Sequence, residues 1–425
     1  MASFLELTIE RAVAGGRMLA RHEGQVVFVQ GAIPGERVRA RIERRQKQVL
    51  FAEAVEVREA SPDRREPHCD LACGGSAYAH INYERQRRLK ADIIADAFAR
   101  IAKRPLDAPV DVAASPEAGY RMRSRVHVQQ GRWGFYREGT HVMCDAAPTR
   151  QLRPDTCAAI ESFLAARPAI ADRLAAITVS ENIDASARVL QLEIRENARR
   201  LNVIDDGDNV GEGVHGVTSI DGPVLWGAAW VEDTARSIWA TWEGGAPIDA
   251  DITWRRRPAS FFQGNRYLLG ALVSEVLRAS DGARRVIDLY AGGGLFSVAL
   301  AARGAHVVSV EMDGSSTRDL TDNAKPFGER LVPLVSPVEA ILKQRPPFTA
   351  DTIVMDPPRV GATPEAIAGL VTWNAPRIVY VSCDPPTLAR DCAKLFAAGY
   401  RLTSLQGFDL FPNTAHVEAV AVLER

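Results

Sequence analysis

The fold of the second half of this chain is decided by RVIDLYAGGGLF, residues 285–296. An apolar run ends at Tyr290 and passes through three consecutive glycines, residues 292–294, into a helical pattern. Glycines at such a turn let the backbone come close to a bound molecule. The stretch therefore predicts a buried strand that turns directly into a helix beside a small-molecule site.

Further short apolar runs follow this stretch, each separated from the next by a helical segment: HVVSVE, LVPLV, DTIVMD, RIVYVS and HVEAVAVL. Strands that are apolar along their whole length and alternate with helices form mostly parallel sheets covered on both faces. Residues 256–425 are thus predicted to form an α/β domain. Ligands of such sheets bind beyond the carboxyl ends of the strands, and the informative side chains of this sequence fall there.

Two carboxylates belong to this predicted site. Asp288 lies within the first strand, and Glu311 ends the second, where it can accept hydrogen bonds from the hydroxyls of a ribose. NAD and S-adenosylmethionine both carry such a ribose. A dinucleotide-binding turn would place a glycine-like residue at Ser297 and has no need of Asp288, which weakens that alternative.

A third carboxylate and a cysteine follow later strands. Asp356 begins the rigid loop DPPR, and Cys383 comes just before a helix that is predicted to begin near Thr387. The partial positive charge at a helix N-terminus favours a thiolate, so we expect the pKa of Cys383 to lie below the usual value of about 8.5. Cys392 lies inside that helix and is interpreted as a buried apolar filler.

The first 58 residues predict a small β-barrel, because short β-type runs alternate there with turn signals. Arg37, Arg39 and Arg41 alternate with apolar residues and therefore share the outer face of one predicted strand. This stripe fits two interpretations equally well, a track for a phosphate backbone and an ordinary solvated face. Residues 59–255 are predicted to form a β-rich central domain that includes a long amphipathic helix at residues 82–101.

The composition limits the partners and the compartment. The chain has 425 residues, a formal net charge of −1 and six cysteines. A nucleic-acid partner must therefore be held by a local basic surface. The sequence contains no leader-like segment and no run apolar enough to cross a bilayer, so we expect a cytoplasmic protein. In a reducing compartment the cysteines are expected to be free thiols, ligands or nucleophiles.

Taken together, these motifs resemble those of the RNA uracil-5 methyltransferase family, in particular its ribosomal-RNA branch. The matching runs are FFQGN, VIDLYAGGGLFS, VVSVE, DPPR, IVYVSCDPPTLARD and DLFPNTAHVEAV. The resemblance implies a Rossmann-like class I methyltransferase domain, on which the helix at residues 82–101 packs. The N-terminal barrel resembles the TRAM module, an RNA-binding barrel of the OB type.

The resemblance assigns a role to seven residues. Cys383 would be the nucleophile that adds to carbon 6 of a uracil, and Glu418 would be the base that later accepts the proton of carbon 5. Five residues would contact the cofactor S-adenosyl-L-methionine: Gln263, Tyr290, Leu295, Glu311 and Asp356.

Ribosomal members of the family often hold a four-iron, four-sulfur cluster on four cysteines. This sequence keeps Cys69 and Cys73 as remnants of that motif, with Ser76 in place of the third cysteine and Thr149 in place of the fourth. Two thiolates would not hold such a cluster firmly. We therefore expect neither an iron–sulfur cluster nor another metal.

Ribosomal RNA is the favoured partner, and the protein is expected to be a monomer that does not associate with membranes. Three alternatives stay open: an RNA cytosine-5 methyltransferase, a transfer-RNA uracil-5 methyltransferase, and an RNA-binding or assembly factor without catalytic activity. The cytosine enzymes usually have a second cysteine in the loop that here reads DPPR. A protein that only binds RNA would have no use for Cys383 and Glu418 together.

Overall fold

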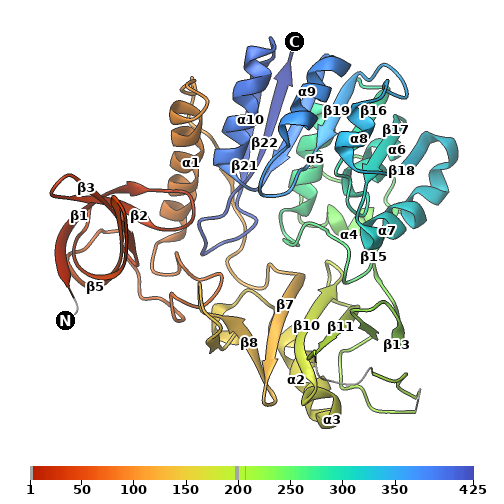
Figure 1. Cartoon of the computed structure of the whole chain (residues 1–425). Helices are drawn as coiled ribbons and strands as arrows, with labels where there is room; N and C mark the ends of the chain where they lie inside the picture. Colours follow the sequence, from red (N-terminus) through yellow and green to blue (C-terminus); the bar gives the residue numbers. More distant parts are fainter. Residues whose placement is uncertain (1–2, 197–200, 206) are drawn as a thin grey trace.

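The computed structural model describes residues 3–196, 201–205 and 207–425. The chain forms three bodies, an N-terminal barrel, a central β-sheet domain and a larger layered domain, with the barrel to the left of the layers and the central sheet below them in the view of Figure 1. None of the helices in the described ranges combines the length and the apolar character needed to cross a bilayer.

The N-terminal barrel closes in the strand order β1-β2-β3-β5-β4. Its side chains alternate between core and surface, because Val38 and Ala40 are fully buried while Arg37 and Arg41 are exposed. The barrel predicted from the sequence is confirmed. Its strands are β1 (Phe4–Ala12), β2 (Met18–His22), β3 (Gln25–Gln30), β4 (Arg37–Gln46) and β5 (Val49–Glu59).

The central domain is built on a seven-stranded sheet in the order β13-β12-β11-β10-β7-β8-β9. Ile160 and Phe163 of one helix pack with strand residues such as Val126 and Ile177 in a single core. The elements are β7 (Arg123–Gln129), β8 (Arg132–Tyr136), β9 (Met143–Cys144), η1 (Ala147–Thr149), α2 (Pro154–Ala166), α3 (Pro168–Ala171), β10 (Leu174–Glu181), β11 (Arg188–Ile194), β12 (Gly216–Ser219) and β13 (Val224–Gly227).

The layered domain contains an eight-stranded sheet in the order β18-β17-β16-β19-β20-β22-β21-β6. Neighbouring strands from β18 to β20 are parallel, and β22 runs antiparallel to β20 and β21, which confirms the predicted mostly parallel α/β sheet. The strands are β6 (Val112–Ala113), β16 (Arg285–Leu289), β17 (His306–Glu311), β18 (Leu331–Val335), β19 (Thr352–Met355), β20 (Arg377–Ser382), β21 (Arg401–Phe408) and β22 (Glu418–Glu424), beside the separate ribbon β14 (Val231–Thr234) and β15 (Thr253–Arg256).

Helices cover both faces of this sheet, which explains why its strands are apolar along their length. One core joins α5 and α6 to the sheet, and a second core joins α1, α8, α9 and α10 to the other face. The helices are α1 (Tyr83–Arg100), α4 (Ala235–Ile238), α5 (Leu269–Ala279), α6 (Leu295–Ala302), α7 (Gly314–Ala324), η2 (Lys325–Arg330), α8 (Val338–Leu342), α9 (Pro364–Trp373) and α10 (Pro385–Ala397).

Helix α1 belongs to two cores at once. Its Leu89 packs in the core of the barrel, whereas its Ile94 packs against the eight-stranded sheet. Between them lies Lys90, which is fully buried and donates a hydrogen bond of 2.5 Å to the carboxylate of Asp409. The helix therefore fastens the barrel to the layered domain.

Candidate functional site

A cavity of about 840 Å³ lies at the carboxyl ends of β16, β19 and β20. The chain runs from β16 outward to β17 and β18, then returns to β19 on the other side of β16. Open α/β sheets bind ligands in the crevice that such a reversal creates. Six of the seven residues singled out from the sequence line this cavity: Gln263, Tyr290, Glu311, Asp356, Cys383 and Glu418.

Leu295 is the seventh residue, and it lies elsewhere. It is the first residue of α6, and its buried side chain packs in the core beneath the sheet. Its carbonyl oxygen accepts a hydrogen bond from the indole of Trp254. The first turn of the helix directs this side chain inward, and the cofactor contact that the resemblance implies for Leu295 stays a prediction.

The turn after β16 has the backbone shape that its glycines predict. Gly292 and Gly294 have φ angles of 55° and 88°, in the left-handed region that favours glycine. A Cβ atom on Gly294 would lie only 2.8 Å from Leu320. The N–H of Gly292 donates a hydrogen bond of 2.8 Å to Glu311. Backbone that lines the cavity and a carboxylate thus meet at the strand ends, as a ribose-bearing ligand requires.

Two aspartates near this turn lie in surroundings of low polarity. Burial raises the pKa of Asp288 and the pKa of Asp356 to about 7. Asp288 accepts a hydrogen bond from the hydroxyl of Ser297 beneath the turn. Asp356 faces the cavity and accepts a hydrogen bond of 3.2 Å from the amide of Gln263. Asp356 is therefore the aspartate that can contact a ligand directly.

Cys383 lies between β20 and α10, in the same cavity as Asp356 and Glu418. Burial raises the pKa of its thiol to about 12, the two carboxyl groups act in the same direction, and Arg359 opposes them. The side chain of Asp384, which caps α10, adds a further negative charge. The lowered pKa that we expected for Cys383 is wrong, because desolvation and the neighbouring carboxyl groups raise it.

Glu418 is the first residue of β22, and its side chain is buried. Its Oε1 atom has no hydrogen-bond partner among the residues that the structure describes. Burial raises the pKa of Glu418 well above its usual value, and the nearby Asp356 adds to the effect. A thiol and an unpartnered carboxyl group in one cavity are the pair that nucleophilic catalysis with proton transfer needs.

Three arginines on the cavity wall were not identified from the sequence: Arg121, Arg123 and Arg359. In the described part of the chain, the hydrogen bonds of the Arg121 and Arg123 guanidinium groups go to neutral acceptors. Burial lowers the pKa of both groups. Half-buried cations that form no ion pair with the described residues suit an anionic ligand such as phosphate. The signal in the sequence was the alternation of arginines in YRMRSR, residues 120–125.

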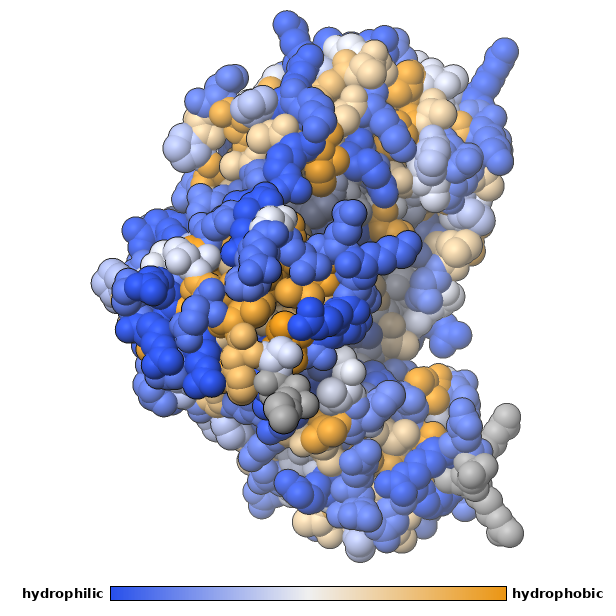
Figure 2. All heavy atoms as spheres, turned by 60° about the vertical axis from the view of Figure 1, so that its left-hand side comes forward, coloured by the Kyte–Doolittle hydropathy of each residue, from blue (hydrophilic) through white to orange (hydrophobic). Residues whose placement is uncertain are grey.

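The arginine stripe on the barrel is largely neutralised. Arg37 forms an ion pair of 2.7 Å with Glu59, and Arg41 forms one with Glu53, both across the neighbouring strand β5. The guanidinium of Arg39 lies over an aromatic ring. Figure 2, which brings the barrel side forward, shows hydrophilic side chains around an apolar area. Of the two interpretations, these contacts favour the solvated face.

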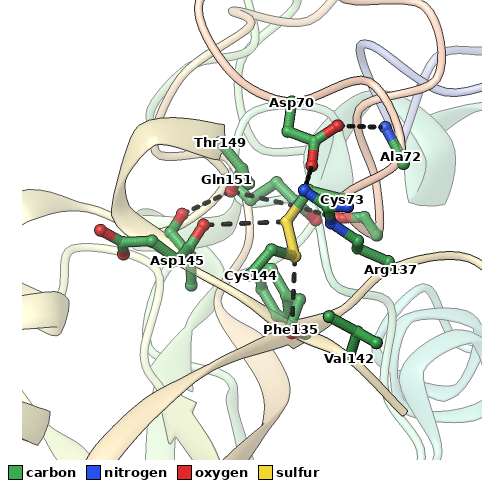
Figure 3. Close-up of a disulfide and its surroundings, with 12 residues drawn as sticks. Asp70, Ala72, Cys73, Phe135, Arg137, Val142, Cys144, Asp145, Thr149 and Gln151 are labelled. Carbon is green, nitrogen blue, oxygen red and sulfur yellow. Dashed lines mark hydrogen bonds and ion pairs between the residues drawn. A yellow bond between two sulfur atoms is a disulfide. The ribbon is translucent and has the colours of Figure 1, made fainter. Parts of the chain in front are cut away.

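Two cysteines correct the expectation that the cysteines would be free thiols, ligands or nucleophiles. Cys73 and Cys144 form a disulfide, with their Cα atoms 5.8 Å apart (Figure 3). Cys69 stays free beside the hydroxyl of Ser76. The residues here do not fit a four-cysteine cluster, because Cys73 is bonded to Cys144, and Ser76 and Thr149 stand at two of the four ligand positions. Elsewhere, the cysteine of α10 at position 392 is fully buried, as predicted.

The layered fold and the ligand-binding geometry at its strand ends define a class I, S-adenosylmethionine-dependent methyltransferase. The tRNA (uracil-54, C5)-methyltransferase of Pyrococcus abyssi, solved in complex with S-adenosyl-L-homocysteine, has the same fold. The TM-score is 0.70 at 22% sequence identity, and the match covers 98% of this chain and 99% of that chain.

The sequence comparisons narrow the class to a family. A TRAM domain model matches residues 3–55, and a tRNA (Uracil-5-)-methyltransferase model matches residues 342–425. An RNA methyltransferase of Streptomyces avermitilis is 34% identical, with 100% of this chain and 99% of the relative covered. The 23S rRNA (uracil(1939)-C(5))-methyltransferase RlmD of Thiobacillus denitrificans is 32% identical, with 96% and 97% covered. The chain belongs to the RNA uracil-5 methyltransferase family, which confirms the resemblance found in its motifs.

Proposed function

We propose that this protein methylates carbon 5 of a uracil in ribosomal RNA, with Cys383 as the nucleophile and Glu418 as the proton acceptor. The observation that carries the proposal is the meeting of these two side chains in one cavity with Asp356 and the glycine turn. Relatives that are named as 23S ribosomal-RNA enzymes and match along nearly their whole length support ribosomal RNA as the substrate.

The residues of the cavity fit S-adenosyl-L-methionine as the methyl donor. Glu311 offers a carboxylate for the ribose hydroxyls, and the turn after β16 lets the backbone approach the ligand. Asp356 and Glu418 are buried carboxyl groups of the same cavity, and a positively charged sulfonium bound beside them would favour their ionised forms. Gln263 and Tyr290 complete the proposed contacts. The cofactor supplies an electrophilic methyl group.

Carbon 5 of uracil is a weak nucleophile and needs activation. The thiol of Cys383 would lose its proton to solvent, and the thiolate would form a bond to carbon 6, which moves the electrons of the double bond toward the carbonyl at carbon 4 as an enolate. Carbon 5 then takes the methyl group, and Glu418 accepts the proton that carbon 5 carries. The bond between carbon 6 and sulfur breaks as the double bond returns. The raised pKa of Glu418 makes it a stronger base than an ordinary carboxylate.

Two variants test these roles. In Glu418→Gln the proton of carbon 5 cannot leave, so the sulfur stays bonded and a protein–RNA adduct that resists denaturant accumulates. Cys383→Ala forms neither adduct nor methylated product. Cys392→Ala, which removes the buried thiol of α10, is the matched control and keeps methylating. Product formation by Cys383→Ala at the wild-type rate would contradict the proposed nucleophile.

The substrate is tested by mapping methylated pyrimidines in RNA from cells with and without this protein. We expect 5-methyluridine to disappear from ribosomal RNA and to persist in transfer RNA. Loss from transfer RNA alone would favour the transfer-RNA alternative, and loss of 5-methylcytidine would favour the cytosine alternative. The loop after β19 has Pro357, Pro358 and Arg359, and no cysteine, which supports uracil.

A further inference from the structure

The orientation of Arg121 in the catalytic cavity depends on one neutral side chain. The guanidinium donates from Nε to the carbonyl of Arg123 at 3.1 Å and from one terminal nitrogen to Oε1 of Gln151 at 2.7 Å. The first acceptor belongs to the same strand region, so of these two hydrogen bonds the second reaches across to another segment. The guanidinium also lies over the ring of Phe135, 5.8 Å from its centre, but that contact supplies no hydrogen-bond direction. Gln151 therefore sets the direction of the fork.

Gln151 is itself held firmly. Its side chain is buried, and its Nε2 donates to the carbonyl of Gly74 at 2.8 Å and to the hydroxyl of Thr149 at 3.2 Å. The backbone carbonyl of Gln151 accepts a hydrogen bond of 3.0 Å from the backbone N–H of Arg121. Gly75, with φ of 84°, makes room for the amide, because a Cβ there would lie 2.5 Å from it. The side-chain amide of Gln151 therefore uses both its oxygen, which accepts from Arg121, and its nitrogen, which donates to Gly74 and Thr149.

The anchor of this amide is a loop that is itself fixed. Gly74 follows Cys73, whose disulfide to Cys144 ties the loop to β9, and the N–H of Gly74 donates to the carbonyl of Tyr136 at 3.1 Å. Figure 3 shows Gln151 beside this disulfide. A continuous series of contacts thus leads from the disulfide loop, through Gln151, to the wall of the catalytic cavity.

We propose that Gln151 is a positioning residue, which holds the guanidinium of Arg121 toward a phosphate group of the RNA at the target uracil. This inference rests on the proposed RNA methylation. A planar guanidinium binds phosphate through paired hydrogen bonds and needs a fixed direction to do so. Neither hydrogen-bond acceptor of the Arg121 guanidinium in the described part of the chain is a carboxylate, and a neutral amide orients it without cancelling its charge.

The test is a double-mutant cycle between Gln151→Met and Arg121→Met in the full chain, with methyl transfer to a ribosomal-RNA fragment as the readout. Gln151→Met should raise KM for RNA about tenfold, the size expected when a hydrogen bond to a charged group is lost. The midpoint of S-adenosyl-L-homocysteine binding should not change. If Gln151 acts through Arg121, the double variant is no weaker than Arg121→Met alone.

Two further variants separate positioning from general stability. Gly75→Ala displaces the same amide from the other side and should raise KM for RNA in the same way. Gln406→Met removes a glutamine bound to Asp111 at the far sheet edge and should leave KM for RNA unchanged. Independent, multiplying effects of Gln151→Met and Arg121→Met would overturn the inference. Failure of the wild-type protein to methylate any RNA would instead remove the proposed function.

Discussion

The thiol of Cys383 lies under opposing influences. Burial and the carboxyl groups of Asp356 and Glu418 favour the neutral thiol, whereas Arg359 favours the thiolate. The pKa of about 12 shows that the first set dominates in the protein alone. A neutral thiol resists alkylation and oxidation, since the thiolate is the reactive form.

This balance predicts the pH dependence of Cys383 alkylation. Because its pKa is raised, the thiolate fraction is small at neutral pH and should grow steadily from about pH 7 to about pH 9, without an inflection. Arg359→Met removes the one opposing charge and should slow alkylation further at every pH. Peptide mass spectrometry after treatment with iodoacetamide measures the rate. An inflection below about pH 8 would show that the helix N-terminus dominates after all.

Single residues also show what the sequence could reveal about the site. Cys383 and Asp356 follow strands of one sheet, so their meeting could be inferred from linear order alone. Arg121 comes from the start of the central sheet, and no linear pattern places it against a distant domain. The inward direction of Leu295 depends on where α6 begins, which the sequence leaves uncertain by a residue or two.

At the scale of elements, the buried ion pair between α1 and the segment before β22 is a weak point of the fold. Lys90→Met leaves Asp409 buried without its cation and should lower the free energy of unfolding by about 3–5 kcal/mol. The double variant Lys90→Met, Asp409→Leu should recover much of the loss, because no charge stays buried. Denaturant unfolding of both variants measures the difference. Equal losses in the two variants would mean that packing, and not charge, carries the effect.

The disulfide links two elements that are 71 residues apart in the sequence. Replacing Cys73 and Cys144 together by serine should lower the free energy of unfolding by up to about 4 kcal/mol, the loop-closure value for a loop of this length. Calorimetry under non-reducing conditions measures the shift. Cys69→Ser, a nearby free thiol, is the control and should leave the midpoint almost unchanged. An unchanged midpoint in the double variant would mean that the bond does not constrain the unfolded chain.

Elements with long apolar runs were predicted well, and elements that depend on distant partners were not. The strands of the layered domain can be recognised in the sequence as continuous apolar runs, because both faces of the sheet are buried. The two-residue strand β6 exists only because β21 pairs with it from almost 300 residues away. The disulfide was not predicted for the same reason, because Cys73 and Cys144 meet only when β9 folds against the loop at Cys73.

For the whole molecule, a net charge of −1 means that RNA is attracted by local cations alone. Arg123→Met should reduce the slope of the logarithm of RNA affinity against the logarithm of salt concentration by about 0.7, the value for one lost phosphate contact on a single strand. Arg37→Met is the matched control, because Arg37 is already paired with Glu59 and should not alter the slope. Fluorescence anisotropy with labelled RNA measures both. A larger change for Arg37 than for Arg123 would move the main phosphate contacts to the barrel.

Helix α1 contributes side chains to the barrel core and to the catalytic core along a single rigid rod. The barrel therefore cannot swing freely on a tether, and its surface keeps a fixed separation from Cys383. An RNA that touches both must present its reactive uracil at that same separation. For such an RNA, the spacing within its fold, as well as its base sequence, would decide which uracil reaches Cys383.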